Sequence, residues 1–202
     1  MLTEYLLAKI TLIIPVTLAW GYYSDTLLAR EGDTGAFGEL VKLYKDPIQR
    51  YLYKLTGDVE QAGDLTQDTF LKAYQNLNNI RSDLAFKPWL YRIATRTVHS
   101  AWRRARLKNF ISFDGEKLPG RKLTEDTVKN LEKKLAVRTA LHEVPRNHRE
   151  CLVLHFVEGF KYREIALTLG ISEEAVRKRV ARGKEIFKEA YKINGGEDNE
   201  MQ

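Results

Sequence analysis

The sequence predicts an all-α protein in which two small helical domains are joined by a flexible linker, the C-terminal one a helix-turn-helix. Apolar residues recur at steps of three and four through both halves of the 202-residue chain, as in amphipathic helices. No convincing run of alternating apolar and polar residues predicts strands. Between the halves this periodicity is lost, and Gly115, Pro119 and Gly120 punctuate a stretch typical of a linker.

The same patterns predict the domain boundaries. We expect an apolar N-terminal extension over residues 1–23, a first domain over 24–107, a linker over 108–127, a second domain over 128–193 and a polar tail over 194–202. The second helical block is expected to begin near Val128, and the tail is expected to be disordered because it is short and polar.

The N-terminal extension contains the apolar run Tyr5–Trp20, interrupted by Lys9 and Pro15. This run is shorter than the roughly 20 apolar residues that span a bilayer. It also lacks the basic segment and cleavage site of a secretory signal. A helix packed on the body, or an extension foreign to the domains, is the favoured interpretation, and a segment over residues 5–20 that is membrane-associated or cleaved is the alternative. A cytoplasmic protein is otherwise expected, since the single cysteine suits a reducing compartment.

Three helices are predicted in the first domain. The first starts at Ala36, is expected to kink or break near Asp46 because Pro47 follows, and ends at Thr56-Gly57. The second begins at Asp58, and a loop over residues 76–83 follows it. Its inward positions are Val59, Ala62, Leu65, Phe70, Ala73 and Leu77. Pro88 lies in the first turn of the third helix, where proline is tolerated.

The third helix combines a basic stripe with an apolar face. At about 100° per residue, the stripe contains Arg92, Arg96, His99, Arg103 and Arg106, and the apolar face contains Leu90, Ile93, Ala94, Val98 and Ala101. A solvated face of mixed charge is a weak interpretation here, because residues 86–109 contain no acid. Cations edged by aromatic rings are typical of single-stranded nucleic acid binding. A membrane surface is the alternative.

Residues 162–187 show the spacing of a helix-turn-helix. Ala166 is small where two helices cross, Gly170 supplies a left-handed turn, and Ser172 can cap the second helix. The second helix presents an outward stripe suited to the DNA major groove: Arg177, Lys178, Ala181 and Arg182. A plain helical hairpin with a basic face is the alternative. The net charge of +6 agrees with an anionic partner.

In this order, the motifs resemble those of an extracytoplasmic-function (ECF, group 4) sigma factor of the sigma-70 family. QAGDLTQDTFLKAY (residues 61–74) resembles region 2.2, FKPWLYRIATRTVHSAWRRAR (86–106) resembles regions 2.3 and 2.4, and residues 144–187 resemble region 4. The resemblance implies that the C-terminal domain reads the −35 element as duplex, while the N-terminal domain recognises and melts the −10 element. It also implies docking on the β′ coiled coil and β flap of core RNA polymerase, and inhibition by an anti-sigma factor.

The resemblance assigns residues to three sites. Core polymerase docking falls to Asp64, Gln67, Asp68 and Leu71. Contact with the −10 element falls to Asn79, Arg81, Ser82, Lys87, Arg92, Arg96, His99, Trp102, Arg103 and Arg106, the first three beside a flipped base. Contact with the −35 element falls to Tyr162, Arg163, Ser172, Glu174, Arg177, Lys178, Ala181, Arg182 and Lys184. The chain departs from the family pattern at Arg96, where relatives often have Asn, and at Glu174-Ala175, where they often have Gly-Thr.

No catalytic, metal or cofactor site is predicted. The four histidines do not cluster with carboxylates or cysteines, and no phosphate-binding glycine loop is present. Cys151 stands among apolar residues and is expected in the core. We therefore expect neither enzymatic activity nor a small-molecule substrate. The main alternative function is a stand-alone helix-turn-helix regulator with an N-terminal sensing or dimerisation domain, and a further one is a membrane-tethered adaptor.

Overall fold

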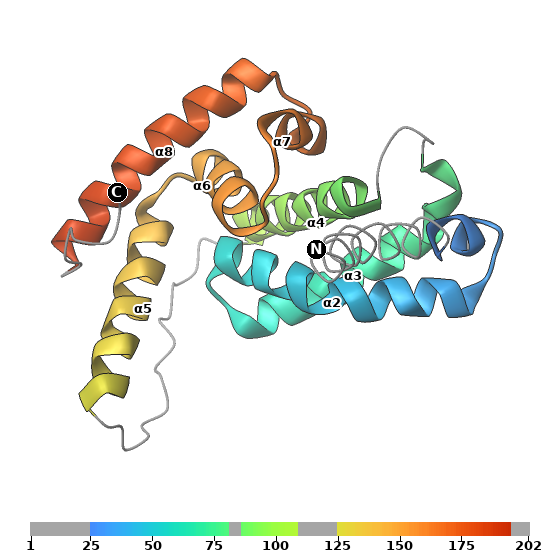
Figure 1. Cartoon of the computed structure of the whole chain (residues 1–202), viewed down its shortest axis with the longest axis horizontal. Helices are drawn as coiled ribbons and strands as arrows, with labels where there is room; N and C mark the ends of the chain where they lie inside the picture. The colour runs from blue at the N-terminus through green and yellow to red at the C-terminus, as the bar shows by residue number, and fades with distance from the viewer. Residues whose placement is uncertain (1–24, 81–85, 109–124, 195–202) are drawn as a thin grey trace, which may run out of the picture.

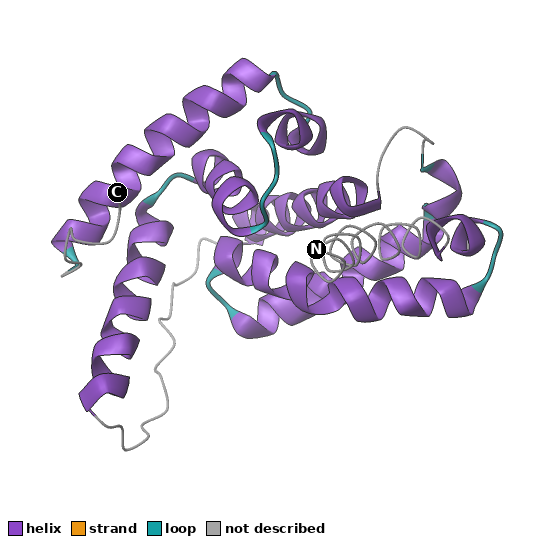
Figure 2. Cartoon of the chain, viewed as in Figure 1, coloured by secondary structure: helices purple, strands orange, loops and turns teal. Residues whose placement is uncertain are grey.

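The computed structural model describes residues 25–80, 86–108 and 125–194, whose regular elements are all helical (Figure 2). A helical turn over residues 25–30 precedes α2 (Thr34–Thr56), α3 (Val59–Gln75), the 3-10 turn η1 (Leu77–Asn79) and α4 (Phe86–Lys108). The second group comprises α5 (Glu125–Glu143), α6 (Arg146–Leu152), the π-helical turn η2 (Val153–Val157), α7 (Tyr162–Leu169) and α8 (Glu173–Ile193). The predicted all-α fold is confirmed.

Helices α2, α3 and α4 lie side by side and form the first group (Figure 1). Their apolar faces meet at residues with no more than 1% exposure, including Leu40, Ile48, Leu52, Leu90 and Val98. The predicted apolar face of α4 is therefore largely confirmed, although Ile93 and Ala101 are only half-buried. Because the apolar face of α4 is buried in this core, only its opposite, basic face is free to contact other groups.

Helix α2 passes through Pro47 without interruption, so the break predicted near Asp46 is wrong. Ile48 and Tyr51, on the next turn, are fully buried. Their packing offsets the hydrogen bond that proline cannot donate. The predicted end is confirmed, because Gly57 adopts a left-handed φ of +80° and its N–H donates to the Tyr53 carbonyl.

Helix α3 begins where expected, with the Asp58 side chain accepting a hydrogen bond from the Gln61 backbone N–H at 2.9 Å. The prediction that Val59 faces inward is wrong: it is 57% exposed, because the first helical residue projects beyond the core. The loop predicted from residue 76 contains the turn η1, which is held by buried Leu77 and Ile80.

Helices α5 to α8 form the second group. Helix α5 begins at Glu125, three residues before the expected start of the block. Gly170 has a φ of +69°, and the Ser172 hydroxyl accepts from the Ala175 backbone N–H at 3.1 Å, so both predicted roles in the helix-turn-helix are confirmed. Helix α8 packs on α5, α6 and α7 (Figure 1), with Gly183 buried against Leu152.

The two groups pack against each other through α4 and α7, and one continuous apolar core includes residues of both. At the junction, the ring of Phe160 lies 5.0 Å from that of Tyr91, centroid to centroid, and is 3% exposed. Lys87 Nζ lies 4.7 Å from the same Phe160 centroid. This junction lies beside the basic stripe of α4.

Candidate nucleic-acid interface

Four residues of the predicted α4 stripe are described, and none of them is buried. Arg96 and Arg103 are exposed, while Arg92 and His99 are half-buried. Arg103 donates to the Ser100 hydroxyl at 2.9 Å, which orients its guanidinium along the helix. The side chain of Arg106 lies outside the described residues, as do Arg81, Ser82 and the side chain of Asn79. The predicted pocket for a flipped base is thus not part of the described structure.

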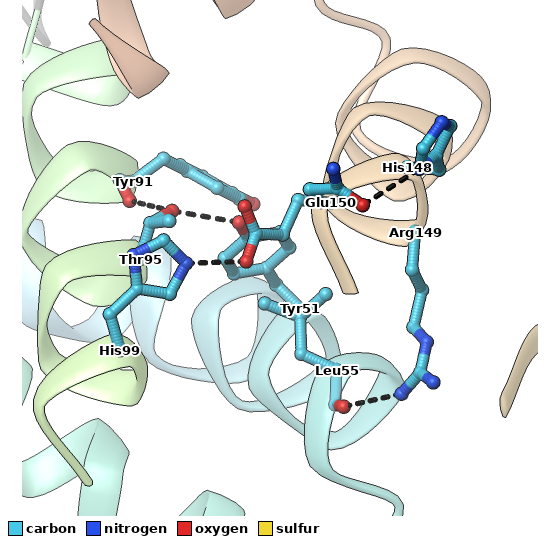
Figure 3. A network of polar contacts seen from close by, with 9 residues as sticks. Tyr51, Leu55, Tyr91, Thr95, His99, His148, Arg149 and Glu150 are labelled. Atoms are coloured by element: carbon cyan, nitrogen blue, oxygen red, sulfur yellow. Dashed lines mark hydrogen bonds and ion pairs between the residues drawn. The ribbon is translucent and has the colours of Figure 1, made fainter. Parts of the chain in front are cut away.

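Residues of the second group contact the α4 stripe directly. Figure 3 shows His99 facing Glu150, whose Oε1 lies 2.5 Å from His99 Nε2. The guanidinium carbon of Arg146 lies 4.4 Å from the centroid of the Trp102 ring. His99 and Trp102, both assigned to the −10 element, therefore make contacts within the protein, and so does Lys87, described next.

Glu158 makes two contacts with the N-terminal part of α4. Its carbonyl accepts from Lys87 Nζ at 2.8 Å, and its carboxylate accepts a hydrogen bond from the Tyr91 hydroxyl. Burial, followed by this hydrogen bond to Glu158, raises the pKa of Tyr91 well above its ordinary value. The phenol thus remains protonated and keeps donating across the junction.

Arg149 forms a second polar connection between the groups. Its Nη1 donates to the Leu55 carbonyl at the end of α2, at 2.8 Å (Figure 3). Its other donors reach the carbonyls of His142 at 2.6 Å and Val144 at 3.1 Å. Burial, then the charge of Arg149, lowers the pKa of His142 to about 4. The neutral imidazole lies against Gly57, where a Cβ would come within 2.6 Å of its Cε1.

The recognition helix α8 presents its predicted stripe to solvent. Arg177, Lys178, Ala181 and Arg182 are all exposed, as are Arg163, Ser172 and Lys184 among the other residues assigned to the −35 element. Tyr162 is half-buried, with its ring 4.8 Å from that of His155, and so also packs within the domain. Glu174 pairs with Lys178 at 2.7 Å, and both side chains are exposed. Glu174, one of the two positions that depart from the family pattern, thus restrains the Lys178 ammonium.

The face assigned to polymerase docking lies on α3. Asp64 and Gln67 are exposed and Asp68 is half-buried. Leu71 is 58% exposed and Tyr74 is 51% exposed, so the acidic group borders an apolar one. Such a combination suits a protein partner that brings both basic and apolar side chains.

Among the described residues, no group of three or more histidine, cysteine or acidic side chains could hold a metal ion, and none of their helices could cross a bilayer. The apolar run Tyr5–Trp20 lies outside the described residues. Cys151 is fully buried as predicted, and burial raises its pKa to about 11.

Sequence reasoning missed the residues through which the second group engages α4: Arg146, Arg149, Glu150 and Glu158. A signal was present in Arg149 and Glu150, two charges directly before the apolar run 151–154. Buried charges in such a context need partners. Their partners could not be identified, because they lie 94 and 51 residues away.

The fold and the two cationic faces define a two-part helical DNA-binding protein. Comparison with known families is more specific. Residues 40–108 match the model for sigma-70 region 2, and residues 134–186 match that for sigma-70 region 4. The chain belongs to the ECF sigma factors of the sigma-70 family and is an RNA polymerase sigma factor.

Curated relatives agree over most of the chain. It is 28% identical to the ECF RNA polymerase sigma factor SigW of Bacillus subtilis over 169 residues, which cover 79% of this chain and 90% of that protein. It is 30% identical to the RNA polymerase sigma-H factor of Pseudomonas aeruginosa over 172 residues, which cover 80% and 89% of the two chains.

Solved structures share the fold. CnrH in complex with the cytosolic domain of CnrY has a TM-score of 0.66 at 23% identity, covering 86% of this chain and 98% of that one. The sigma factor RpoE of Bartonella quintana, in complex with the anti-sigma factor NepR, has a TM-score of 0.64 at 22% identity, covering 78% and 97%. The chain therefore shares the fold of these two proteins.

Proposed function

We propose that the α4 stripe holds the melted −10 strand while α8 reads the −35 duplex. The observation that carries this proposal is the division of exposed cations between two helical groups, with Trp102 beside Arg103 on one and an outward cationic stripe on the other. Arginines neutralise backbone phosphates, and an indole can stack an unpaired base. The protein acts without catalysing a reaction, in the cytoplasm where the polymerase transcribes.

Recognition of the −10 strand requires the second group to move away from α4. In the packed arrangement His99 is bonded to Glu150, and the Arg146 guanidinium lies over the Trp102 ring. Lys87 donates a hydrogen bond to the Glu158 carbonyl. Binding of the −10 strand in the complex with core polymerase shifts the population toward the separated arrangement, because only that arrangement frees Lys87, His99 and Trp102 for the strand. An anti-sigma factor, as in the related complexes, holds the chain away from polymerase.

On α8, Arg177 and Arg182 are placed to contact guanine edges or phosphates. Glu174 orients Lys178 through their ion pair, and its negative charge interacts favourably with the positive N-terminal end of the helix dipole. On α4, Arg96 contributes a longer, charged side chain, so we expect the −10 preference to differ from that of relatives with Asn.

The deciding experiment is transcription in vitro with purified core polymerase and a promoter library. We expect defined start sites that depend on the added chain. Start sites identical to those of core polymerase alone would contradict the assignment. Tight operator binding without polymerase would support a stand-alone regulator instead.

A second experiment tests the role of α4. Replacing both Trp102 and Arg103 with alanine should weaken binding to a pre-melted −10 bubble more than binding to the closed duplex, because only the opened strand meets these side chains. Arg50→Ala, an exposed substitution on α2, is the control and should affect neither. Equal losses on bubble and duplex would argue against strand capture.

A further inference from the structure

A small polar cavity lies where α4 meets the second helical group. It has a volume of about 90 Å³, several times what one water molecule requires. Its walls come from α4, α6, α7 and α8 and include Arg92, Arg96, His99, Glu150, Thr168 and Arg179. The cavity therefore exists only while the two groups are packed together.

The lining carries an excess of positive charge. Arg92 and Arg96 approach from α4 and Arg179 from α8, and none of them forms an ion pair with a carboxylate among the described residues. The one carboxylate in the lining, that of Glu150, is 4% exposed and is bonded to His99. Like charges brought together across a partly desolvated junction repel each other, so the packed arrangement favours an added anion.

Thr168 supplies an unused hydrogen-bonding group in the same lining. The residue is 4% exposed, and its hydroxyl has no hydrogen-bond partner in the described structure. A buried hydroxyl without a partner is destabilising. Because Thr168 lines the cavity, an anionic oxygen bound there would accept a hydrogen bond from this hydroxyl.

We propose that this cavity binds one small tetrahedral oxyanion of the phosphate class, held by Arg92, Arg96, Arg179 and the Thr168 hydroxyl. Guanidinium groups form paired hydrogen bonds with such oxygens, and the cavity is too small for a nucleoside. The anion joins α4 to α7 and α8, so it stabilises the packed arrangement. It also occupies two arginines of the α4 stripe, and so opposes binding of the −10 strand.

Titration calorimetry on the full chain tests binding, with inorganic phosphate added at constant ionic strength against a chloride reference. We expect saturable phosphate binding, and Arg179→Gln should weaken it by about tenfold, the usual effect of losing a charge-assisted hydrogen bond. Arg50→Gln, which removes an exposed arginine of α2, should leave the affinity unchanged. No saturable heat, or equal weakening by both variants, would overturn the proposal.

Thr168→Val separates a ligand-binding role from a structural one. Valine has nearly the shape of threonine without the hydroxyl, so the variant should unfold at the same temperature as the parent or higher when phosphate is absent. The rise in unfolding temperature that phosphate produces should shrink at the same time. An undiminished rise would exclude the hydroxyl as a ligand.

Spin labels test whether the anion holds the groups together. Lys45→Cys on α2 and Glu185→Cys on α8 place labels at exposed positions of the two groups, while Cys151 is buried and does not compete. Phosphate should reduce the long-distance population severalfold relative to chloride. Unchanged distances in the presence of bound phosphate would refute the bridging role. These assays contain no DNA or polymerase, so a negative result would refute the anion site without bearing on the proposed function, which the transcription assay tests separately.

Discussion

Arg149→Met is predicted to weaken the connection between the two helical groups more than any exposed substitution nearby. The side chain is 7% exposed, and its hydrogen bonds go to the carbonyls of Leu55, His142 and Val144 at 2.8, 2.6 and 3.1 Å. Methionine fills similar space but donates nothing. Only the bond to Leu55 crosses to α2, so the variant loses that link together with the local bonds to His142 and Val144.

The expected decrease in the free energy of unfolding follows from the three carbonyl acceptors that lose a donor. A buried carbonyl that loses its partner costs about 1–3 kcal/mol. The desolvation of the guanidinium, which also lowers the pKa of Arg149, is no longer required in the variant and offsets part of this cost. The net decrease in the free energy of unfolding should be about 2–4 kcal/mol.

Equilibrium unfolding in urea, followed by circular dichroism and tryptophan fluorescence, measures this decrease. The matched control is Arg146→Met on the same helix, which loses only an exposed contact with the Trp102 ring, worth about 0.5–1 kcal/mol. Arg149→Lys should fall between the two, because it keeps the charge but not the planar fork of donors. A loss for Arg149→Met no larger than that for Arg146→Met would refute the reasoning.

Four further predictions concern single groups. The free energy of unfolding should fall by about 1–2 kcal/mol between pH 7 and pH 4.5. The reason is that His142 takes up a proton near pH 6.5 in the unfolded chain, while burial holds its folded pKa at about 4. Urea titrations at both pH values should show that His142→Gln lacks this pH-dependent decrease. Gly57→Ala should destabilise by at least about 1–2 kcal/mol, since its φ is +80° and a Cβ would meet the imidazole at 2.6 Å, whereas Gly63→Ala, in an open helical position, should be neutral or stabilising; similar melting temperatures for the two would contradict this. Ser172→Ala should cost about 1 kcal/mol and weaken −35 duplex binding in fluorescence anisotropy, and unchanged stability would argue against the cap. Cys151 should resist thiol reagents at pH 8 and react in urea, because burial raises its pKa to about 11; rapid labelling of the folded chain would count against it.

The features that sequence could predict are those set by neighbouring residues. The turn at Gly170, the cap at Ser172 and the buried face of α4 each follow from local spacing. Pro47 shows the limit, because its effect on α2 depends on packing against residues distant in the chain. Local propensity is weak against burial of this size.

The contacts between the groups could not be predicted for a related reason. Glu150 and Glu158 reach His99 and Tyr91 across 51 and 67 residues. Nothing in the helical pattern of either partner specifies the other. The pattern shows only that α4 has a basic side, and it leaves open whether that side meets solvent, DNA or the protein's own second half.

The position of Phe160 has a consequence for how the chain competes for polymerase. Its ring is nearly inaccessible because it is enclosed by Tyr91 and Lys87, so separating the groups exposes aromatic surface to water. If the −10 strand binds only the separated form, as proposed above, that form is a minority of the free population, and every tenfold reduction in it weakens the apparent affinity for the promoter tenfold. Substitutions that loosen this aromatic contact should therefore act as gain-of-function alleles, with a higher share of the cell's polymerase at unchanged protein abundance.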